Sequence, residues 1–282
     1  PGAARVLEEA LGISRDLGDR LGQATALTSL GIVWRLAGDY PGAARVLEEA
    51  LGISRDLGDR LGQATALTSL GIVWRLAGDY PGAARVLEEA LGISRDLGNL
   101  LGQANALNVL GGVRRLAGDH SGAARALEEA LGISRDLGNL LGQASTLTDL
   151  GIVRRLTGDY PGAARDLEEA LGIYRDVGDR SSEVETLNDL GTLHRVRGDL
   201  RQAVSCHRQA LDLARQIGSA QDEAHALAGH GRCEMAGGHI SAAQGRLRQA
   251  LAIFQRIGAA EAVGVSAELR ALTNDRPAAQ GP

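Results

Sequence analysis

One arginine recurs at an interval of forty residues through most of this chain, at Arg35, Arg75, Arg115, Arg155 and Arg195. A guanidinium group presents a planar fork of N–H donors, which binds carboxylates and phosphates through paired hydrogen bonds. Where the units that carry these residues stack side by side, the guanidinium groups form a row with about 10 Å between neighbours, the usual distance between packed helices. Such a row predicts a site for an acidic or carboxylate-bearing segment.

The same arginines also fit a second interpretation, in which each pairs with a carboxylate inside the array. Two of the later copies contain Asp149 and Asp189, and further aspartates lie in the predicted loops. An arginine that pairs internally would recur in identical repeats as readily as one that binds a ligand. The sequence therefore leaves both interpretations open.

A second group of reactive side chains lies in the last 90 residues. It contains five of the six histidines, His194, His207, His225, His230 and His239, and both cysteines, Cys206 and Cys233. Histidine and cysteine are zinc ligands, and His207 and His230 take apolar positions in neighbouring helices. However, no CxxC or HxxxH spacing is present, and the adjacent side chains of Cys206 and His207 diverge on a helix. Divergence of the terminal copies explains these residues better, and we expect no metal and no other cofactor.

The chain lacks the motifs of common catalytic sites. It contains no phosphate-binding GxxxxGKS or GxxxxGKT, no GxSxG and no HExxH pattern. Adjacent glutamates such as Glu48 and Glu49 diverge on a helix, so they do not form an acid and base pair. We therefore predict that the protein is not an enzyme.

All of these side chains belong to a sequence repeat, and the repeat determines where they lie in the fold. Residues 1–58 are identical to residues 41–98, and diverged copies continue to about residue 258. A fixed period of this length indicates supersecondary units that stack on one another, and it predicts one continuous array.

Each unit is predicted to hold two antiparallel helices. Asp39 and Pro41 begin one helix, because aspartate caps free N–H groups and proline suits the first turn. Its apolar stripe is Ala43, Leu47, Ala50, Ile53 and Leu57. The other helix spans about Leu61 to Ala77, with the stripe Ala64, Leu67, Leu70, Gly71 and Trp74. We expect Gly71 to let a neighbouring helix approach closely. Trp74 is expected to pack in the core, although a stacking contact with a ligand stays open.

Composition narrows the classes of function. Hydrophobic residues make up 44% of the chain but aromatic residues only 2%, so the core must be built from small and aliphatic side chains. The net charge of -5 argues against nucleic-acid binding through this region. No apolar run of about 18 residues is present, so we expect no membrane span. Two cysteines form no disulfide framework and fit a reducing, cytoplasmic compartment.

Several of these positions together form a recognisable signature. Ala64, Leu67, Leu70-Gly71, Gly78-Asp79-Tyr80, Ala83, Leu87 and Ala90 match the spacing of the tetratricopeptide repeat, and the match recurs in six units. The period is forty residues rather than the usual 34, and the usual proline after the second helix is absent. These long units resemble those of kinesin light chains and of bacterial signalling proteins. The resemblance implies an all-α fold, a right-handed α-solenoid of antiparallel helix pairs.

The predicted organisation has four parts. Residues 1–17 form the second helix of a truncated repeat, residues 18–257 form six helix pairs, residues 258–273 form a capping helix, and residues 274–282 form a disordered tail. Val265, Leu269 and Leu272 lie on one face of the capping helix. The N-terminal end has no such cap, so we expect the chain to be part of a longer protein, with an end open to self-association.

In the family that this chain resembles, the first helix of each pair lines a concave groove that holds a peptide or a partner helix. The resemblance places the recurrent arginine at this groove, together with uncharged polar side chains. The candidate partner-binding residues are Arg35, Thr68, Arg75, Asn105, Asn108, Arg115, Thr148, Arg155, Asn188 and Arg195. The same face has Ile72, Gly112 and Ile152 at another recurring position.

These observations predict a scaffold that binds a protein or a peptide, with an acidic or carboxylate-bearing segment as the favoured ligand. The resemblance suggests the sensing or interaction region of a larger cytoplasmic bacterial signalling or regulatory protein. The alternative is a structural solenoid that self-associates and has no separate ligand. Nucleic acid and membrane are not expected as partners of this region.

Overall fold

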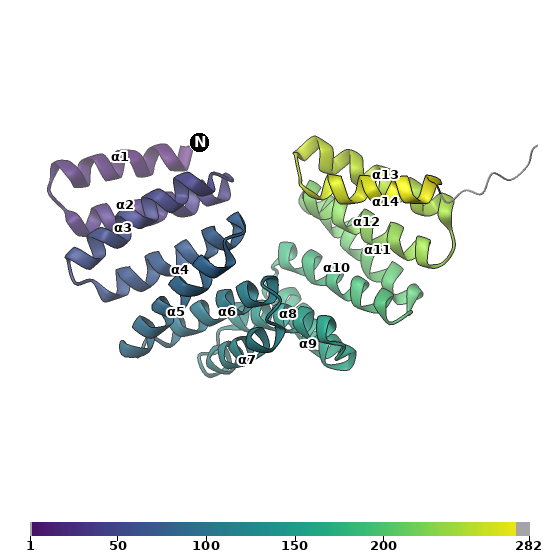
Figure 1. Ribbon diagram of the computed structural model, residues 1–282, viewed down its shortest axis with the longest axis horizontal. Helices are drawn as coiled ribbons and strands as arrows, with labels where there is room; N and C mark the ends of the chain where they lie inside the picture. Colours follow the sequence, from purple (N-terminus) through teal and green to yellow (C-terminus); the bar gives the residue numbers. More distant parts are fainter. Residues whose placement is uncertain (1, 275–282) are drawn as a thin grey trace, which may run out of the picture. The chain divides into compact units, whose positions relative to one another are not determined.

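The computed structural model describes residues 2–274, and within that range the chain consists of α-helices joined by short turns (Figure 1). In chain order these are α1 (Gly2–Asp16), α2 (Arg20–Leu36), α3 (Tyr40–Asp56), α4 (Arg60–Ala77), α5 (Tyr80–Asp96), α6 (Leu100–Leu116), α7 (His120–Asp136), α8 (Leu140–Thr157), α9 (Tyr160–Val177), α10 (Arg180–Val196), α11 (Leu200–Ile217), α12 (Ala220–Ala236), α13 (Ile240–Ile257) and α14 (Glu261–Asn274). The predicted all-α solenoid of antiparallel helix pairs is confirmed. The predicted tail, residues 274–282, lies outside the described residues except for Asn274, which ends α14.

The chain divides into two compact units, with the boundary between Val153 and Arg154 inside α8. The N-terminal unit comprises residues 2–153, and the C-terminal unit comprises residues 154–274. The repeat does not reveal this boundary, because the copies at residues 98–137 and 138–177 keep the same pattern. None of the described helices is both long enough and apolar enough to cross a membrane.

Helices α2 to α8 each begin at an aspartate or asparagine whose side chain caps the helix. At the start of α3, the Asp39 carboxylate accepts a hydrogen bond of 2.9 Å from the backbone N–H of Gly42, which has no partner within the helix. A Cβ atom on Gly42 would collide with that carboxylate, which explains why glycine recurs at this place. Helix α4 ends at Ala77 and is followed by Gly78, whose φ of 86° lies in the left-handed region that favours glycine.

Aliphatic side chains seated against glycine build the core of the N-terminal unit. Leu87 of α5 fills the space beside Gly71 of α4, where a Cβ atom would lie only 2.5 Å from the leucine Cγ. The expected close approach at Gly71 is therefore confirmed. The same contact recurs in the neighbouring copies, at Leu47 with Gly31 and at Leu127 with Gly111.

One residue of the predicted stripes is exposed. Leu57 is 46% exposed, because α3 ends at Asp56 and the chain turns away through Gly58 at a φ of 69°. Trp34 and Trp74 are half-buried and pack against the core, which agrees with the packing role expected of them.

Repeated ion pairs join the second helices of successive pairs in the N-terminal unit, which are α1, α3, α5 and α7. An Nη2 atom lies 2.6 to 2.7 Å from a glutamate oxygen in Arg15–Glu49, Arg55–Glu89 and Arg95–Glu129. Each of these side chains is about half exposed, so each pair contributes only about 0.2–1 kcal/mol. Together they fix the register between neighbouring copies on the outer surface.

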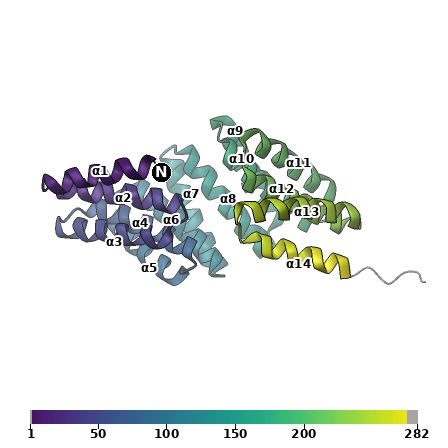
Figure 2. The same ribbon diagram turned by 90° about the horizontal axis from the view of Figure 1, so that it is seen from above.

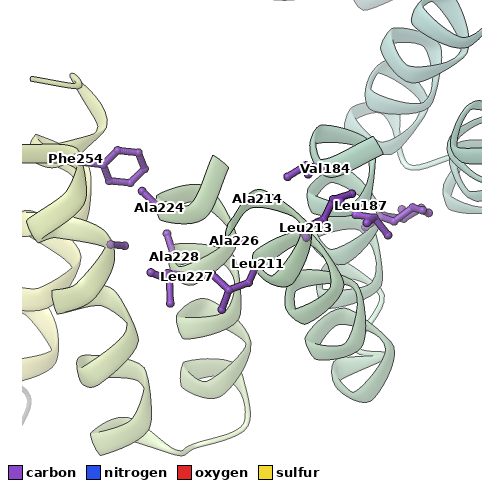
Figure 3. Close-up of a cluster of buried hydrophobic side chains, with 14 of the residues drawn as sticks. Val184, Leu187, Leu211, Leu213, Ala214, Ala224, Ala226, Leu227, Ala228 and Phe254 are labelled. Atoms are coloured by element: carbon purple, nitrogen blue, oxygen red, sulfur yellow. The ribbon is translucent and has the colours of Figure 1, made fainter. Parts of the chain in front are cut away.

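The C-terminal unit has a core of its own, and part of it is drawn in Figure 3. Side chains of α10 to α13 meet there, among them Leu187, Leu211, Leu227 and Phe254. Helix α14 lies beside α13 (Figure 2) and packs against this cluster through Val265, which is 2% exposed. Leu269 and Leu272 of α14 are half-buried against the same cluster.

Candidate functional site

The first helices of the N-terminal unit lie side by side, since α4 contacts both α2 and α6. Equivalent side chains therefore recur from helix to helix. We call the surface formed by Thr68, Ile72 and Arg75 of α4, together with their counterparts on α2 and α6 and with Thr148 and Ile152 of α8, the first-helix face. These side chains are half-buried or exposed in every copy, except at Gly112, which has no side chain.

Small hollows lie between successive first helices. The hollow between α2 and α4 has a volume of ≈ 410 Å³, the one between α4 and α6 ≈ 220 Å³, and the one between α6 and α8 ≈ 290 Å³. Thr68 and Asn105 both line the second hollow, and Asn105 and Asn108 both line the third. Thr148 is half-buried and does not line them, and its hydroxyl donates to the backbone oxygen of Ala144 at 3.0 Å.

The rear wall of each hollow comes from residues that the sequence analysis missed. Ser94 lies in the last turn of the second helix α5, Asn99 caps α6, and both line the hollow between α4 and α6. Ser134 and Asn139 take the same places in the next hollow. The sequence does contain a signal for these residues, because a serine and a capping residue recur five residues apart before α2, α4, α6 and α8.

Arg75, Arg115 and Asp149 form a charged cluster at the other end of the first-helix face. The Arg115 Nη2 atom lies 3.5 Å from the Asp149 Oδ1 atom, and the two side chains are 19% and 25% exposed. Burial raises the pKa of Asp149 above its usual range, and the charges of Arg115 and Arg75 oppose that shift. Burial also lowers the pKa of Arg75 from its usual value, with Asp149 opposing the shift and Arg115 and Arg35 adding to it.

At the spacing of the Arg115–Asp149 pair, Arg155 has Asp189, whereas Arg35 and Arg75 have no carboxylate. Val109 and Ser69 stand 34 residues after Arg75 and Arg35, at the place that Asp149 takes relative to Arg115. Among the described residues, Arg75 and Arg35 make no hydrogen bond or ion pair through their side chains. The buried Nε atom of Arg115 also has no hydrogen-bond partner. The cluster therefore carries more positive than negative charge.

The predicted residues of the C-terminal unit are arranged differently. Asn188 is engaged inside the protein, because its Oδ1 atom lies 3.0 Å from Nδ1 of His207. Arg155 and Arg195 are half-buried, and the buried Nε atom of Arg155 has no hydrogen-bond partner. In α12 the arginine position is taken by Met235.

His207 occupies a core position that other copies fill with leucine. Its ring lies between Gly191 and Gly229, where a Cβ atom would come within 2.6 and 2.3 Å of the imidazole. Burial lowers the pKa of His207 to about 3, and the nearby His230, Arg195 and Arg232 add to the shift. In residues 2–274, no three His, Cys, Asp or Glu side chains are grouped as a metal site requires.

Comparison with known proteins identifies the repeat. Family models described as tetratricopeptide repeat match residues 62–136, 102–176 and 182–256, and a further model of that description matches residues 23–57. The predicted family is thereby confirmed. A sequence comparison with curated proteins finds no match.

Three solved structures illustrate the shared architecture. A Rap protein complexed with Competence and Sporulation Factor has 14% identity and a TM-score of 0.68, covering 90% of this chain and 75% of that one. A STAND protein with a tetratricopeptide repeat sensor from Pyrococcus horikoshii has 14% identity and a TM-score of 0.70, covering 95% and 44%. A putative kinesin light chain from Podosopora anserina, with nearly identical repeats, has 17% identity and a TM-score of 0.56, covering 68% and 95%. At these identities the likeness shows the fold alone.

Proposed function

Because this chain belongs to the tetratricopeptide repeat family, we propose that it is a scaffold whose first-helix face binds an extended acidic segment of a protein or a peptide. The observation that carries this proposal is the unbalanced arginine row. Arg35 and Arg75 make no hydrogen bond or ion pair through their side chains among the described residues, and Asp149 pairs with Arg115 while it acts on Arg75 through its charge. A ligand carboxylate would supply the missing partners through charge-assisted hydrogen bonds.

The helices hold this face ready before a ligand arrives. The arginines sit near the ends of packed helices, and the hollows between those helices offer hydroxyl and amide groups for hydrogen bonds to a peptide backbone. A rigid surface loses little conformational entropy on binding, so less of the interaction energy is spent on ordering it. No catalytic group is needed for this role.

We further propose that the chain is the sensing or interaction region of a larger cytoplasmic bacterial signalling or regulatory protein. Two similar structures support the proposal in different ways. The Rap protein was solved with Competence and Sporulation Factor bound, and the Pyrococcus horikoshii protein carries its repeats as a sensor.

Two matched double charge-reversal variants test whether the first-helix face prefers an acidic ligand. The probe is a fluorescein-labelled serine-rich nonapeptide with two glutamates three residues apart, and the reference peptide has glutamine in their place. We expect the glutamate peptide to bind at least about tenfold more tightly in fluorescence anisotropy. The double variant Arg35→Glu with Arg75→Glu should abolish that preference, whereas Arg85→Glu with Arg125→Glu, on second helices, should keep it. Equal binding of the two peptides to the unmodified protein would refute the proposal.

Self-association is the second candidate function, and one observation favours it. Val6 and Ile13 of α1 are 60% and 54% exposed, whereas the identical positions Val46 and Ile53 of α3 are 5% and 8% exposed. In α3 this face is covered by α1 and α2, so α1 presents a surface that fits a first helix of the same sequence. We propose that a second copy of the chain can cover it.

Sedimentation velocity over a range of concentrations distinguishes this candidate. The unmodified protein should sediment faster as its concentration rises, and the double variant Val6→Asp with Ile13→Asp should not. Val263→Asp, at a position that is 77% exposed on α14, serves as the control. A single concentration-independent species for the unmodified protein would rule out the second candidate.

A further inference from the structure

Exposed leucines gather at the turns of two neighbouring copies in the N-terminal unit. Leu97 and Leu137 directly follow the second helices α5 and α7, and Leu100 and Leu140 begin the first helices α6 and α8. Their exposed fractions lie between 43% and 49%. We call these four side chains the leucine patch.

The two preceding copies have an arginine where the first helices of the leucine patch begin. Arg60 takes the position of Leu100, and its Nη2 atom lies 2.9 Å from the Oδ2 atom of Asp96, at the end of the next second helix. Arg20 and Asp56 form the same pair one copy earlier, at 2.7 Å. These pairs bridge successive turns. The turns therefore lie next to each other along one edge of the unit, and the leucine patch forms one surface.

Folding does not account for leucine at these two arginine positions. Leu100 and Leu140 stay about half exposed, so they add little to the buried core, and leucine and arginine have similar helix propensities. The exchange also removes the ion pair that joins the turns. The copies at residues 98–137 and 138–177 therefore have an apolar surface that contributes little to stability.

The exchange leaves Asp136 without the arginine that its counterparts have. Asp136 stands at the end of α7 as Asp96 stands at the end of α5, and its side chain is exposed. Among the described residues, Asp136 makes no hydrogen bond or ion pair through its side chain. The pairs of Arg20 and Arg60 show that a guanidinium group can reach a carboxylate at this place. An unpaired carboxylate therefore borders the leucine patch, next to Leu137.

We propose that the leucine patch binds an amphipathic helix of another protein, one that carries an arginine beside its apolar stripe. Residues i and i+7 of a helix lie about 10.5 Å apart, and neighbouring first helices lie about 10 Å apart, so two leucines at this spacing contact both turns. An arginine at i+4 lies on the same face and pairs with Asp136 as Arg60 pairs with Asp96. The ligand supplies both the apolar cover and the missing cation. This proposal does not depend on the acidic-segment function.

A designed helix serves as the probe for the leucine patch. It is a fluorescein-labelled peptide of about 20 residues, rich in alanine and glutamine so that it forms a helix, with leucines at i and i+7 and an arginine at i+4. One reference peptide has alanine in place of both leucines, and the other has glutamine in place of the arginine. In fluorescence anisotropy, the probe should bind at least about tenfold more tightly than the alanine reference and about threefold more tightly than the glutamine reference.

The double variant Leu100→Arg with Leu140→Arg restores the residues of the preceding copies and should weaken binding of the probe at least about tenfold. Leu36→Arg with Leu116→Arg is the matched control. These leucines are 72% and 40% exposed at the other ends of first helices, and the net charge changes by the same amount. Leu116 stands about 24 Å from Leu100 along α6, where salt screens the added charge, so the control should keep the affinity within about twofold.

The variant Asp136→Asn tests the ion pair separately from the apolar contact. It should abolish the preference for the arginine probe over the glutamine reference, because the carboxylate that pairs with the arginine is gone. The preference for leucine over alanine should stay, because the four leucines are unchanged.

Several results would overturn the proposal. These are no binding of the probe, equal binding of the probe and the alanine reference, or an equal loss of affinity in both double variants. An arginine preference that survives in Asp136→Asn would overturn the ion pair. Sedimentation velocity tests the other occupant: if the unmodified protein self-associates and only Leu100→Arg with Leu140→Arg prevents it, a second copy of the chain covers the leucine patch in place of a foreign helix.

Discussion

The Nη2 atom of Arg115 lies 3.5 Å from the Oδ1 atom of Asp149, a carboxylate that the protein itself places on its arginine row. Arg75 of the neighbouring first helix α4 also acts on this carboxylate through its charge. Asp149 therefore stands where we propose that a ligand carboxylate binds. It competes with the ligand for Arg115 and reduces the positive charge available at Arg75.

Removal of the Asp149 charge should strengthen binding of an acidic peptide. For Asp149→Asn we expect the glutamate nonapeptide to bind about threefold to tenfold more tightly, which corresponds to roughly 1 kcal/mol for a partly exposed ion pair. Fluorescence anisotropy at several salt concentrations measures the change. Asp136→Asn makes the same change of net charge on an exposed second-helix residue, and an equal gain in both variants would show that only the overall charge matters.

The contact between Gly71 and Leu87 predicts opposite effects for two chemically identical substitutions. Gly71→Ala should lower the free energy of unfolding by about 1–2 kcal/mol, because overpacking of the core outweighs the gain in helix propensity. Gly52→Ala should raise it by up to about 1 kcal/mol, because its Cβ position is open. Urea denaturation measures both. A stabilising Gly71→Ala would mean that Leu87 has room to move aside.

Burial of His207 predicts that the C-terminal unit loses stability in acid. The pKa of His207 is about 3 in the folded protein against 6.5 for the free side chain, so the unfolded chain binds the proton first as the pH falls. The free energy of unfolding should therefore decrease from pH 6.5 downwards, by about 2 kcal/mol at pH 5. Burial also lowers the pKa of His230, which acts in the same direction.

The variant His207→Leu isolates this effect because it restores the residue of the other copies. Its free energy of unfolding should depend less on pH between 7 and 5 than that of the unmodified protein, and the remaining slope belongs to His230 and other groups. The charged groups that act on the His207 ring from neighbouring helices, Arg195 and Arg232, stay in place. An unchanged slope would mean that the ring reaches solvent.

The burial of Val265 predicts that this side chain holds α14 on the C-terminal unit. Its side chain is 2% exposed, so Val265→Asp places an unpaired carboxylate in the core and should release α14. Hydrogen exchange should then show loss of protection across α14 and a lower melting temperature. Val263→Asp, on the exposed side of the same helix, should leave both unchanged, and protection that persists in Val265→Asp would place α14 outside the cooperative structure.

The architecture could be predicted from the sequence because its determinants are local and repeated. Asp39, Gly42 and Gly78 act within a few residues of themselves, and the spacing of Leu47 or Leu67 fixes which side of a helix is buried. The prediction that Leu57 is buried was wrong, because the spacing of apolar residues does not show that the helix has already ended at Asp56.

Much of the candidate site depends on contacts between copies, which a single repeat does not encode. The residue that stands 34 positions after each arginine decides whether that arginine has an ion pair: it is Asp149 for Arg115 but Val109 for Arg75. Ser94 and Asn99 reach the hollows only because a second helix ends beside the next first helix. No contact in the structure explains why position 52 is a glycine.

The seating of Leu87 against Gly71 lies within one forty-residue unit, and the Arg55–Glu89 pair recurs unchanged between units. Loss or gain of a whole unit in the gene therefore leaves every such contact intact. Residues 1–58 and 41–98 are identical, so they offer long matching stretches for unequal recombination. The first-helix face can in this way become longer or shorter in steps of one unit, while each unit keeps the contacts that it needs to fold.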